Sequence, residues 1–201
     1  MRKLGVLLLV GISSLSLLPA IAEEVLKKGQ ELVTPLRQGG YVILIRHAAG
    51  NKDQKDADKV DLNNCDTQRN LSREGRMDSR QIGQAMDTLQ IPVGKVLASP
   101  FCRAMDTGRL AFSRVKPFQA LNYVTTSSED EKKAASLLKP LLANRPAVGT
   151  NTVLISHSTN IKAALGFVPE EGEALIFKPE GNNNYKLVGR IRVQEWSSLM
   201  P

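Results

Sequence analysis

Residues 41–47 read Tyr41-Val42-Ile43-Leu44-Ile45-Arg46-His47, and this stretch decides the fold class. An unbroken apolar run rich in β-branched residues is typical of a strand buried on both faces, as in a parallel sheet. The run leads directly into Arg46 and His47. The sequence therefore predicts a buried parallel strand that ends in two residues able to take part in chemistry.

Two further apolar segments end in a similar way. Segment 95–98 leads into Ser99-Pro100, with Arg103 one helical turn further on, and segment 152–155 leads into Ser156-His157. Weaker strand patterns cover 116–124, 173–178 and 185–193. We expect the last two of these to close the sheet as an antiparallel pair.

Helical patterns alternate with these strands. The first covers 24–36, and the second begins at the N-cap residue Ser72 and ends at about residue 89. The third covers 99–112, with Pro100 in its first turn. The fourth is capped by Ser127 or Ser128 and ends at 142, and the fifth covers 160–165. This alternation predicts an α/β fold: a three-layer sandwich with a mostly parallel central sheet flanked by helices. We expect one such domain over residues 23–201.

Residues 1–22 carry the pattern of a secretory signal peptide. Arg2 and Lys3 precede an apolar segment, and Ala20-Ile21-Ala22 supplies the small residues of a cleavage site. An uncleaved membrane anchor is the alternative, but the apolar segment is short and ends at Pro19. We therefore expect a periplasmic or secreted protein with no stable membrane insertion after cleavage.

The composition favours a small anionic partner. The 201 residues carry a formal net charge of +7, and the basic residues are scattered rather than gathered in a stripe with aromatic residues. Nucleic-acid binding is therefore not expected, whereas a small phosphorylated substrate suits the charge. The histidines and cysteines lack the spacing of zinc ligands. A glycine-rich nucleotide-binding loop follows a strand, whereas Gly39-Gly40 precedes the first strand. We expect no metal and no cofactor.

The chain has two cysteines, Cys65 and Cys102. In an oxidising compartment an even count predicts a disulfide, and two reduced thiols are the alternative. Cys65 lies in the polar, aperiodic segment 48–70, which predicts a long loop. A bridge would tie this loop to the residue before Arg103 and hold Arg69 near it as an extra anion contact.

Both histidines of the chain directly follow a predicted buried strand. Ligands bind beyond the carboxyl ends of the strands in open α/β sheets, so we expect Arg46, His47, Arg103 and His157 to meet at one edge. Arginine offers a phosphate group permanent charge and several donors, and a neutral imidazole can attack phosphorus. Singly, each residue is equally compatible with an ordinary surface or ion-pairing role, and it is their joint arrangement that favours a phosphate site.

Four ordered motifs resemble those of the histidine phosphatase superfamily. Segment 44–48 looks like its Arg-His-Gly signature, with Ala48 in place of the glycine. Segment 70–76 is similar to its Leu-Ser/Thr-x-x-Gly-Arg helix start, 99–107 to its Ser-Pro-x-x-Arg-Ala-x-x-Thr segment, and 155–161 to the segment that carries its second histidine. The resemblance spans residues 41–195, nearly the whole chain after the signal segment.

The resemblance implies a metal-independent phosphoric monoester hydrolase. It implies that His47 is the nucleophile of a phosphohistidine intermediate and that Arg46, Arg103 and His157 bind the phosphate. The residues after Ala48 do not match the Glu-Thr-x-x-Asn pattern of the phosphoglycerate mutases, which favours hydrolysis. Some exported relatives act on phosphates of lipopolysaccharide core sugars, so an envelope phosphosugar is one expected substrate. A non-catalytic binder of phosphate or phosphosugar is the alternative, although binding alone does not require His47.

The proton donor is not determined by the motifs. Ser158 follows His157, which excludes the branch of the family that uses an aspartate there. Glu129 and Asp130 begin a predicted helix where another branch carries its donor, and Glu173 begins a strand expected beside the site. We expect Glu129 first, Glu173 second and Asp130 third, against the alternative that these residues cap helices or lie in solvent.

Overall fold

The computed structural model describes residue 26, residues 29–123 and residues 127–200, so the predicted signal peptide lies outside the described part. The strands are β1 (Val42–Arg46), β2 (Val93–Ala98), β3 (Lys116–Pro117), β4 (Asn151–Ser156), β5 (Ala174–Gly181) and β6 (Asn184–Ile191). The helices are α1 (Gln30–Gln38), α2 (Arg73–Thr88), α3 (Cys102–Phe112), α4 (Ser128–Ala143), α5 (Ser158–Leu165) and α6 (Val193–Leu199), with short 3₁₀ turns η1 (Cys65–Thr67) and η2 (Gln119–Leu121).

The strands form one six-stranded sheet in the order β3-β2-β4-β1-β5-β6. β1 pairs in parallel with β4, which pairs in parallel with β2. β5 is antiparallel both to β1 and to β6. The predicted mostly parallel sheet with an antiparallel closing pair is therefore confirmed, and β1, β2 and β4 end at the same edge.

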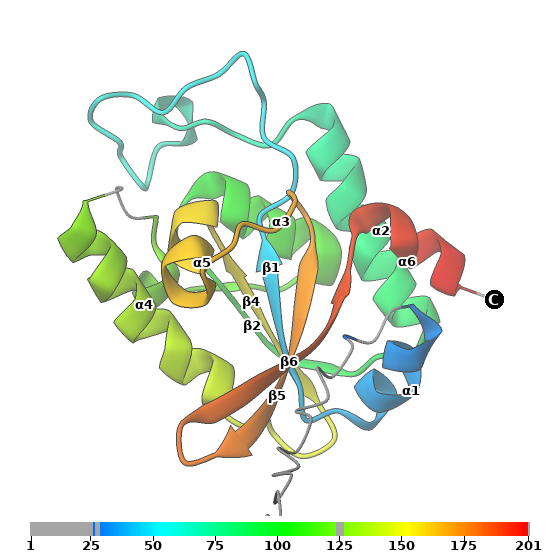
Figure 1. The fold of residues 1–201 in the computed structure, drawn as a ribbon. Helices are drawn as coiled ribbons and strands as arrows, with labels where there is room; N and C mark the ends of the chain where they lie inside the picture. Colours follow the sequence, from blue (N-terminus) through cyan, green and yellow to red (C-terminus); the bar gives the residue numbers. More distant parts are fainter. Residues whose placement is uncertain (1–25, 27–28, 124–126, 201) are drawn as a thin grey trace, which may run out of the picture.

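Helices cover both faces of the sheet, as Figure 1 shows. Ile43 and Ile45 of β1 pack in a core formed with α1, α2, α3 and α6, whereas Val42 and Leu44 pack in a second core formed with α4 and α5. All four of these side chains are fully buried. The β1 sequence lacks polar alternation because neither face of the strand meets water.

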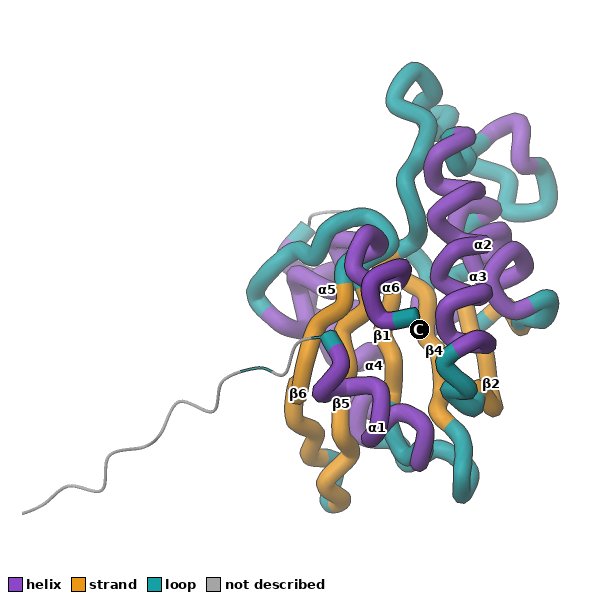
Figure 2. The backbone as a smooth tube through the Cα atoms, turned by 90° about the vertical axis from the view of Figure 1, so that its right-hand side faces the viewer, coloured by secondary structure: helices purple, strands orange, loops and turns teal. Residues whose placement is uncertain are grey.

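A long loop over residues 48–71 rises above the carboxyl ends of the parallel strands (Figures 1 and 2). Its base is closed by an antiparallel bridge between Gly50 and Leu71 and by a hydrogen bond of 2.9 Å from Asn51 N–H to the Asn70 carbonyl. Gly75 of α2 allows the helix to approach this base closely, because a Cβ atom at this position would lie only 2.0 Å from the Ala49 carbonyl oxygen. The loop is therefore anchored at the edge where the strands end.

Several predicted element boundaries were wrong. α1 begins later than predicted, and β3 is only two residues long rather than covering 116–124. α3 begins at Cys102, because the Ser99 hydroxyl accepts the Phe101 N–H and Phe101 becomes the N-cap. Val193 belongs to α6, which the buried Trp196 side chain anchors in the core, and not to the last strand.

Within the described ranges, no helix is both long enough and apolar enough to cross a membrane.

Candidate active site

His47 lies immediately beyond β1 and is almost fully buried. Its backbone N–H donates to the Ser156 carbonyl of the neighbouring strand at 3.0 Å. Its Nδ1 atom lies 2.9 Å from the Ala48 carbonyl oxygen, and because a carbonyl can only accept, Nδ1 carries the proton. The Nε2 atom of the neutral ring is therefore the one with the lone pair.

The turn after His47 is held by α3. Ala48 N–H donates to Thr107 Oγ1 at 3.1 Å, and the same hydroxyl donates to the Arg103 carbonyl at 2.7 Å. Thr107 is fully buried. The Arg-Ala-x-x-Thr part of the third motif thus fixes the ring of His47 through its neighbour Ala48.

His157 follows β4 and lies beside His47, with ring centroids 5.2 Å apart. Its Nε2 atom lies 2.8 Å from Ser99 Oγ, which comes from the end of β2. Phe101 and Tyr123 pack edge-on against the His157 ring, with centroids 5.3 and 5.4 Å away. Residues at the ends of β1, β2 and β4 therefore combine to fix the His157 ring.

The two predicted arginines reach the same edge from β1 and α3. Arg46 Nη1 donates to the Pro169 carbonyl at 2.9 Å, and its Nη2 atom lies 3.4 Å from Glu171 Oε1. Arg103 is more deeply buried and stacks on Phe101 at 4.5 Å. Its Nη1 atom donates to Asp56 Oδ1 at 3.0 Å. The structure thus brings together all four residues that the strand ends predicted.

The predicted disulfide between Cys65 and Cys102 is present, with the two Cα atoms 5.8 Å apart. Cys102 N–H also donates to the side chain of Gln68 at 2.8 Å. The next loop residue, Arg69, donates to Glu171 Oε1 at 2.8 Å through Nη2. Gly50 leaves room for this guanidinium, since a Cβ atom there would lie 2.3 Å from Arg69 Nη2. The loop therefore carries a third arginine to the site, next to Arg46 through their shared partner Glu171.

Three buried nitrogen atoms of these residues have no hydrogen-bond partner within the described part of the chain: Arg46 Nε, Arg69 Nε and His157 Nδ1. The Ser99 hydroxyl accepts from Phe101 N–H and can donate its own proton to His157 Nε2. In that tautomer all three atoms carry N–H bonds. Buried donors are rarely left unpaired, so three on neighbouring residues indicate a site built to receive an anion.

Burial keeps both imidazoles neutral. It lowers the pKa of His47 to about 3, an effect opposed by the Ala48 carbonyl and reinforced by Arg103, Arg46 and Arg69. Burial also lowers the pKa of His157 well below its ordinary value, with smaller contributions from His47 and the arginines. The positive charge of the empty site is therefore supplied by guanidinium groups, and the His47 lone pair is available at neutral pH.

The three predicted proton donors differ in their exposure and in their contacts. Glu129 is exposed in the first turn of α4, just after residues 124–126, which are not described. Asp130 follows it and lines a cavity next to Tyr123. Glu173 is fully buried, and both its oxygens are held by Arg190, at 2.7 and 3.0 Å. Glu173 is therefore an ion-pair anchor for β6, and this geometry weighs against its use as a donor.

Two carboxylates at the site were missed by the sequence analysis. Asp56 accepts from both Arg103 and the backbone N–H of Arg69, and Glu171 bridges Arg46 and Arg69. Asp56 lies in the aperiodic loop, and Glu171 lies outside the four motifs and the predicted strands. The arginine side chains that they bind are more than 40 residues away in sequence, with separations of 47 residues for Asp56 and Arg103 and 102 residues for Glu171 and Arg69. No local pattern could have assigned them.

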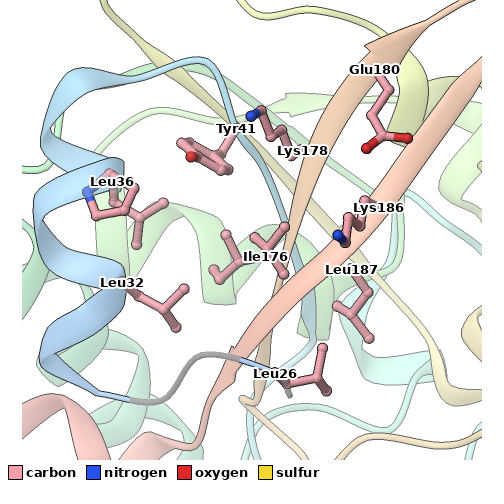
Figure 3. Close-up of a pocket in the computed structure, with 11 residues that line it drawn as sticks. Leu26, Leu32, Leu36, Tyr41, Ile176, Lys178, Glu180, Lys186 and Leu187 are labelled. Carbon is pink, nitrogen blue, oxygen red and sulfur yellow. The ribbon is translucent and has the colours of Figure 1, made fainter. Parts of the chain in front are cut away.

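A separate cavity of about 170 Å³ lies between α1 and the β5–β6 pair (Figure 3). Tyr41, Lys178 and Lys186 line it. Tyr41 precedes β1, whereas His47 follows β1, so this cavity lies at the opposite end of the strand. Over the described ranges, no group of three or more His, Cys, Asp or Glu residues is arranged to hold a metal ion. Metal independence stays a prediction.

Among solved structures, the fold of the chain is similar to that of several phosphatases. The protein histidine phosphatase SixA, solved with tungstate, is 18% identical with a TM-score of 0.54, and the match covers 77% of this chain and 97% of that one. A phosphoserine phosphatase from Entamoeba histolytica solved with 3-phosphoglyceric acid is 16% identical with a TM-score of 0.57, covering 78% and 98%. The alpha-ribazole phosphatase from Shigella flexneri is 14% identical with a TM-score of 0.55, covering 73% and 94%.

No family model and no curated protein sequence matches the chain. The structural neighbours show that the chain shares the fold of these phosphatases. The resemblance inferred from the four motifs is therefore supported at the level of the fold.

Proposed function

We propose that the chain is an exported, metal-independent phosphomonoesterase in which His47 carries the phosphoryl group. One observation carries the proposal: the Ala48 carbonyl fixes the proton of His47 on Nδ1, so Nε2 has the free lone pair, and neighbouring residues supply three N–H donors that have no partner among the described residues. A phosphate monoester needs such donors around its non-bridging oxygens. The three solved structures compared above are named as phosphatases, which supports the same reaction class.

The reaction has two steps. In the first, the His47 Nε2 lone pair forms a bond to phosphorus, the bond from phosphorus to the leaving oxygen breaks, and a carboxylic acid gives that oxygen a proton. In the second, the carboxylate takes a proton from water, the water oxygen attacks phosphorus, and the bond to Nε2 breaks. Inorganic phosphate and the alcohol are the products. Arg46, Arg69, Arg103 and His157 bind the phosphoryl oxygens throughout.

For the proton donor we propose Glu129. It lies six residues beyond Tyr123, whose ring packs on His157, and it is exposed at the start of α4. Asp56 is the competitor, because it contacts Arg103 directly. A leaving-group test in the Discussion separates the two.

Two observations support export and therefore an envelope or extracellular substrate, such as a phosphosugar. Residues 1–22 have the pattern of a signal peptide. The Cys65–Cys102 disulfide is of a kind that persists in oxidising compartments. Expression of the full chain in bacteria, followed by fractionation, tests this: we expect a protein shortened at residue 22 outside the cytoplasm, and recovery of the full-length chain in the cytoplasm would contradict it.

The activity test uses two minimal substrates, phosphoramidate and p-nitrophenyl phosphate, each with and without a chelator. We expect turnover of both at a rate that the chelator does not change. Loss of turnover on chelation, with recovery on addition of zinc or magnesium, would contradict metal independence. Saturable phosphate binding with no turnover of any ester would instead support the alternative, a non-catalytic phosphate-binding protein.

A further inference from the structure

A cavity of about 490 Å³ lies beside the site described above. Asn122 and Tyr123, which follow η2, form one side of it, and Asp130 and Lys133 from the first two turns of α4 form another. Asn160 of α5 also lines it. Because η2 follows β3 and α5 follows β4, these lining residues lie near the same carboxyl edge of the sheet as His47 and His157.

Tyr123 connects this cavity to the site. Its ring packs edge-on against His157 at 5.4 Å and lies 5.6 Å from the Arg103 guanidinium carbon. The same residue lines the cavity and is 39% exposed. A phosphate bound by Arg103 and His157 would therefore place the rest of its ester against the Tyr123 ring or just beyond it.

Asn122 gives this cavity a polar function. The Asn160 side chain donates to the Asn122 backbone carbonyl at 2.7 Å, and Asn160 is almost fully buried. This contact fixes the Asn122 backbone. The buried Oδ1 atom of the Asn122 side chain has no hydrogen-bond partner within the part of the chain that is described. A buried acceptor without a partner is costly unless a ligand supplies a donor.

We propose that this cavity is the subsite for the leaving group and that it takes a hydroxyl-rich alcohol, such as the sugar or polyol of a phosphate ester. Asn122 Oδ1 accepts a hydroxyl hydrogen, Lys133 and Asp130 offer polar contacts at the far side, and the Tyr123 ring packs against the C–H face of the alcohol. This inference rests on the proposed phosphatase activity. It adds the place of the alcohol in the fold and the residues that select it.

The test compares substrates that share the phosphoryl group but differ in the leaving group. The specificity constant kcat/KM is measured for a hexose 6-phosphate, for phenyl phosphate and for phosphoramidate. The selectivity ratio is the value for the hexose 6-phosphate divided by the value for either of the other two substrates. We expect this selectivity ratio to fall about tenfold in Asn122→Ala, as for loss of one hydrogen bond to a buried group. We expect a similar fall in Tyr123→Ala.

The ratio separates selection from structural damage. A variant that only disturbs His157 or the fold lowers turnover of all three substrates together and leaves the ratio unchanged, and that result in both variants would overturn the proposal. Phe118→Ala is the matched control: Phe118 is 36% exposed, lies four residues before Asn122 and lines other cavities. A preference of the wild-type protein for phenyl phosphate would also overturn the proposal. Absence of turnover of all three substrates by the wild-type protein would contradict the phosphatase activity itself.

Discussion

His47 and His157 lie with their ring centroids 5.2 Å apart, each at the end of a parallel strand and each almost fully buried. Burial is the main cause of the lowered pKa of both rings. The pair therefore stays neutral, and nearby arginines lower the pKa of both rings further. This relationship has consequences for stability as well as for chemistry.

Stability is expected to fall with acidification. In the unfolded chain both histidines take up a proton near pH 6.5, whereas His47 in the folded chain does so only near pH 3. The unfolded state therefore binds more protons in this window, so the stabilisation is complete above about pH 6.5 and is lost as the pH falls. Each histidine contributes at most about 1.4 kcal/mol per pH unit. Urea unfolding between pH 7 and pH 4 measures the slope, which should be shallower in His47→Asn and in His157→Asn. Equal slopes in all three proteins would contradict the burial argument.

Reduction of the Cys65–Cys102 disulfide should lower both stability and phosphate affinity. The bridge closes a loop with a sequence separation of 37, a constraint worth about 3–4 kcal/mol in the chain-entropy model. It also holds the segment that presents Gln68 and Arg69. Unfolding and phosphate inhibition are compared for the oxidised protein and for the Cys65→Ser/Cys102→Ser double variant. Lower stability with unchanged inhibition would show that the bridge does not order Arg69.

Arg103 and Arg109 lie on the same helix and provide a matched pair. The side chain of Arg103 is 5% exposed at the site, whereas that of Arg109 is 57% exposed and pairs with Asp106. Loss of a charged hydrogen bond costs roughly 1.5–3 kcal/mol, so Arg103→Ala should raise the phosphate inhibition constant at least about tenfold. Arg109→Ala should change it less than about twofold. Arg103→Lys, which keeps the charge but loses the planar fork, should fall between them. Equal inhibition constants for all four proteins would remove Arg103 from the phosphate site.

The proton donor can be identified by its dependence on the leaving group. Removal of a general acid typically costs about 10²–10⁴-fold in rate, but p-nitrophenolate leaves without a proton. Glu129→Gln should therefore lose far more activity on an alkyl phosphate than on p-nitrophenyl phosphate. Glu131→Gln, in the same acidic helical turn, is the control. If Asp56→Asn shows this pattern and Glu129→Gln does not, the donor is Asp56.

The sequence predicted those parts of the molecule that local patterns determine. The run before Arg46 and the run before His157 are apolar because both faces of their strands are buried, so the central strands and the residues after them could be read directly. Ser72 does cap α2, since its hydroxyl accepts Gly75 N–H at 3.0 Å. The disulfide followed from the cysteine count and the export pattern.

The missed parts depend on contacts between distant segments. Asp56 and Glu171 become site residues only after the loop folds back over the sheet edge. The end of the last strand was misplaced because Val193 continues an apolar pattern that suits a strand as well as a helix, and only the burial of Trp196 makes the segment α6. Asn122 carries no local signal, because its importance comes from an oxygen that has no partner in the described part of the chain.

The central claim is that His47 forms a covalent bond to phosphorus, and one measurement tests it most directly. The wild-type protein, His47→Asn and His157→Asn are each mixed with excess phosphoramidate, quenched in alkali, which preserves phosphohistidine, and analysed by peptide mass spectrometry. We predict one added phosphoryl group in the wild-type protein, located on His47, and none on His157. His47→Asn should carry no phosphoryl group and should not turn over the substrate. A phosphoryl group on another residue, or full turnover by His47→Asn, would contradict the account.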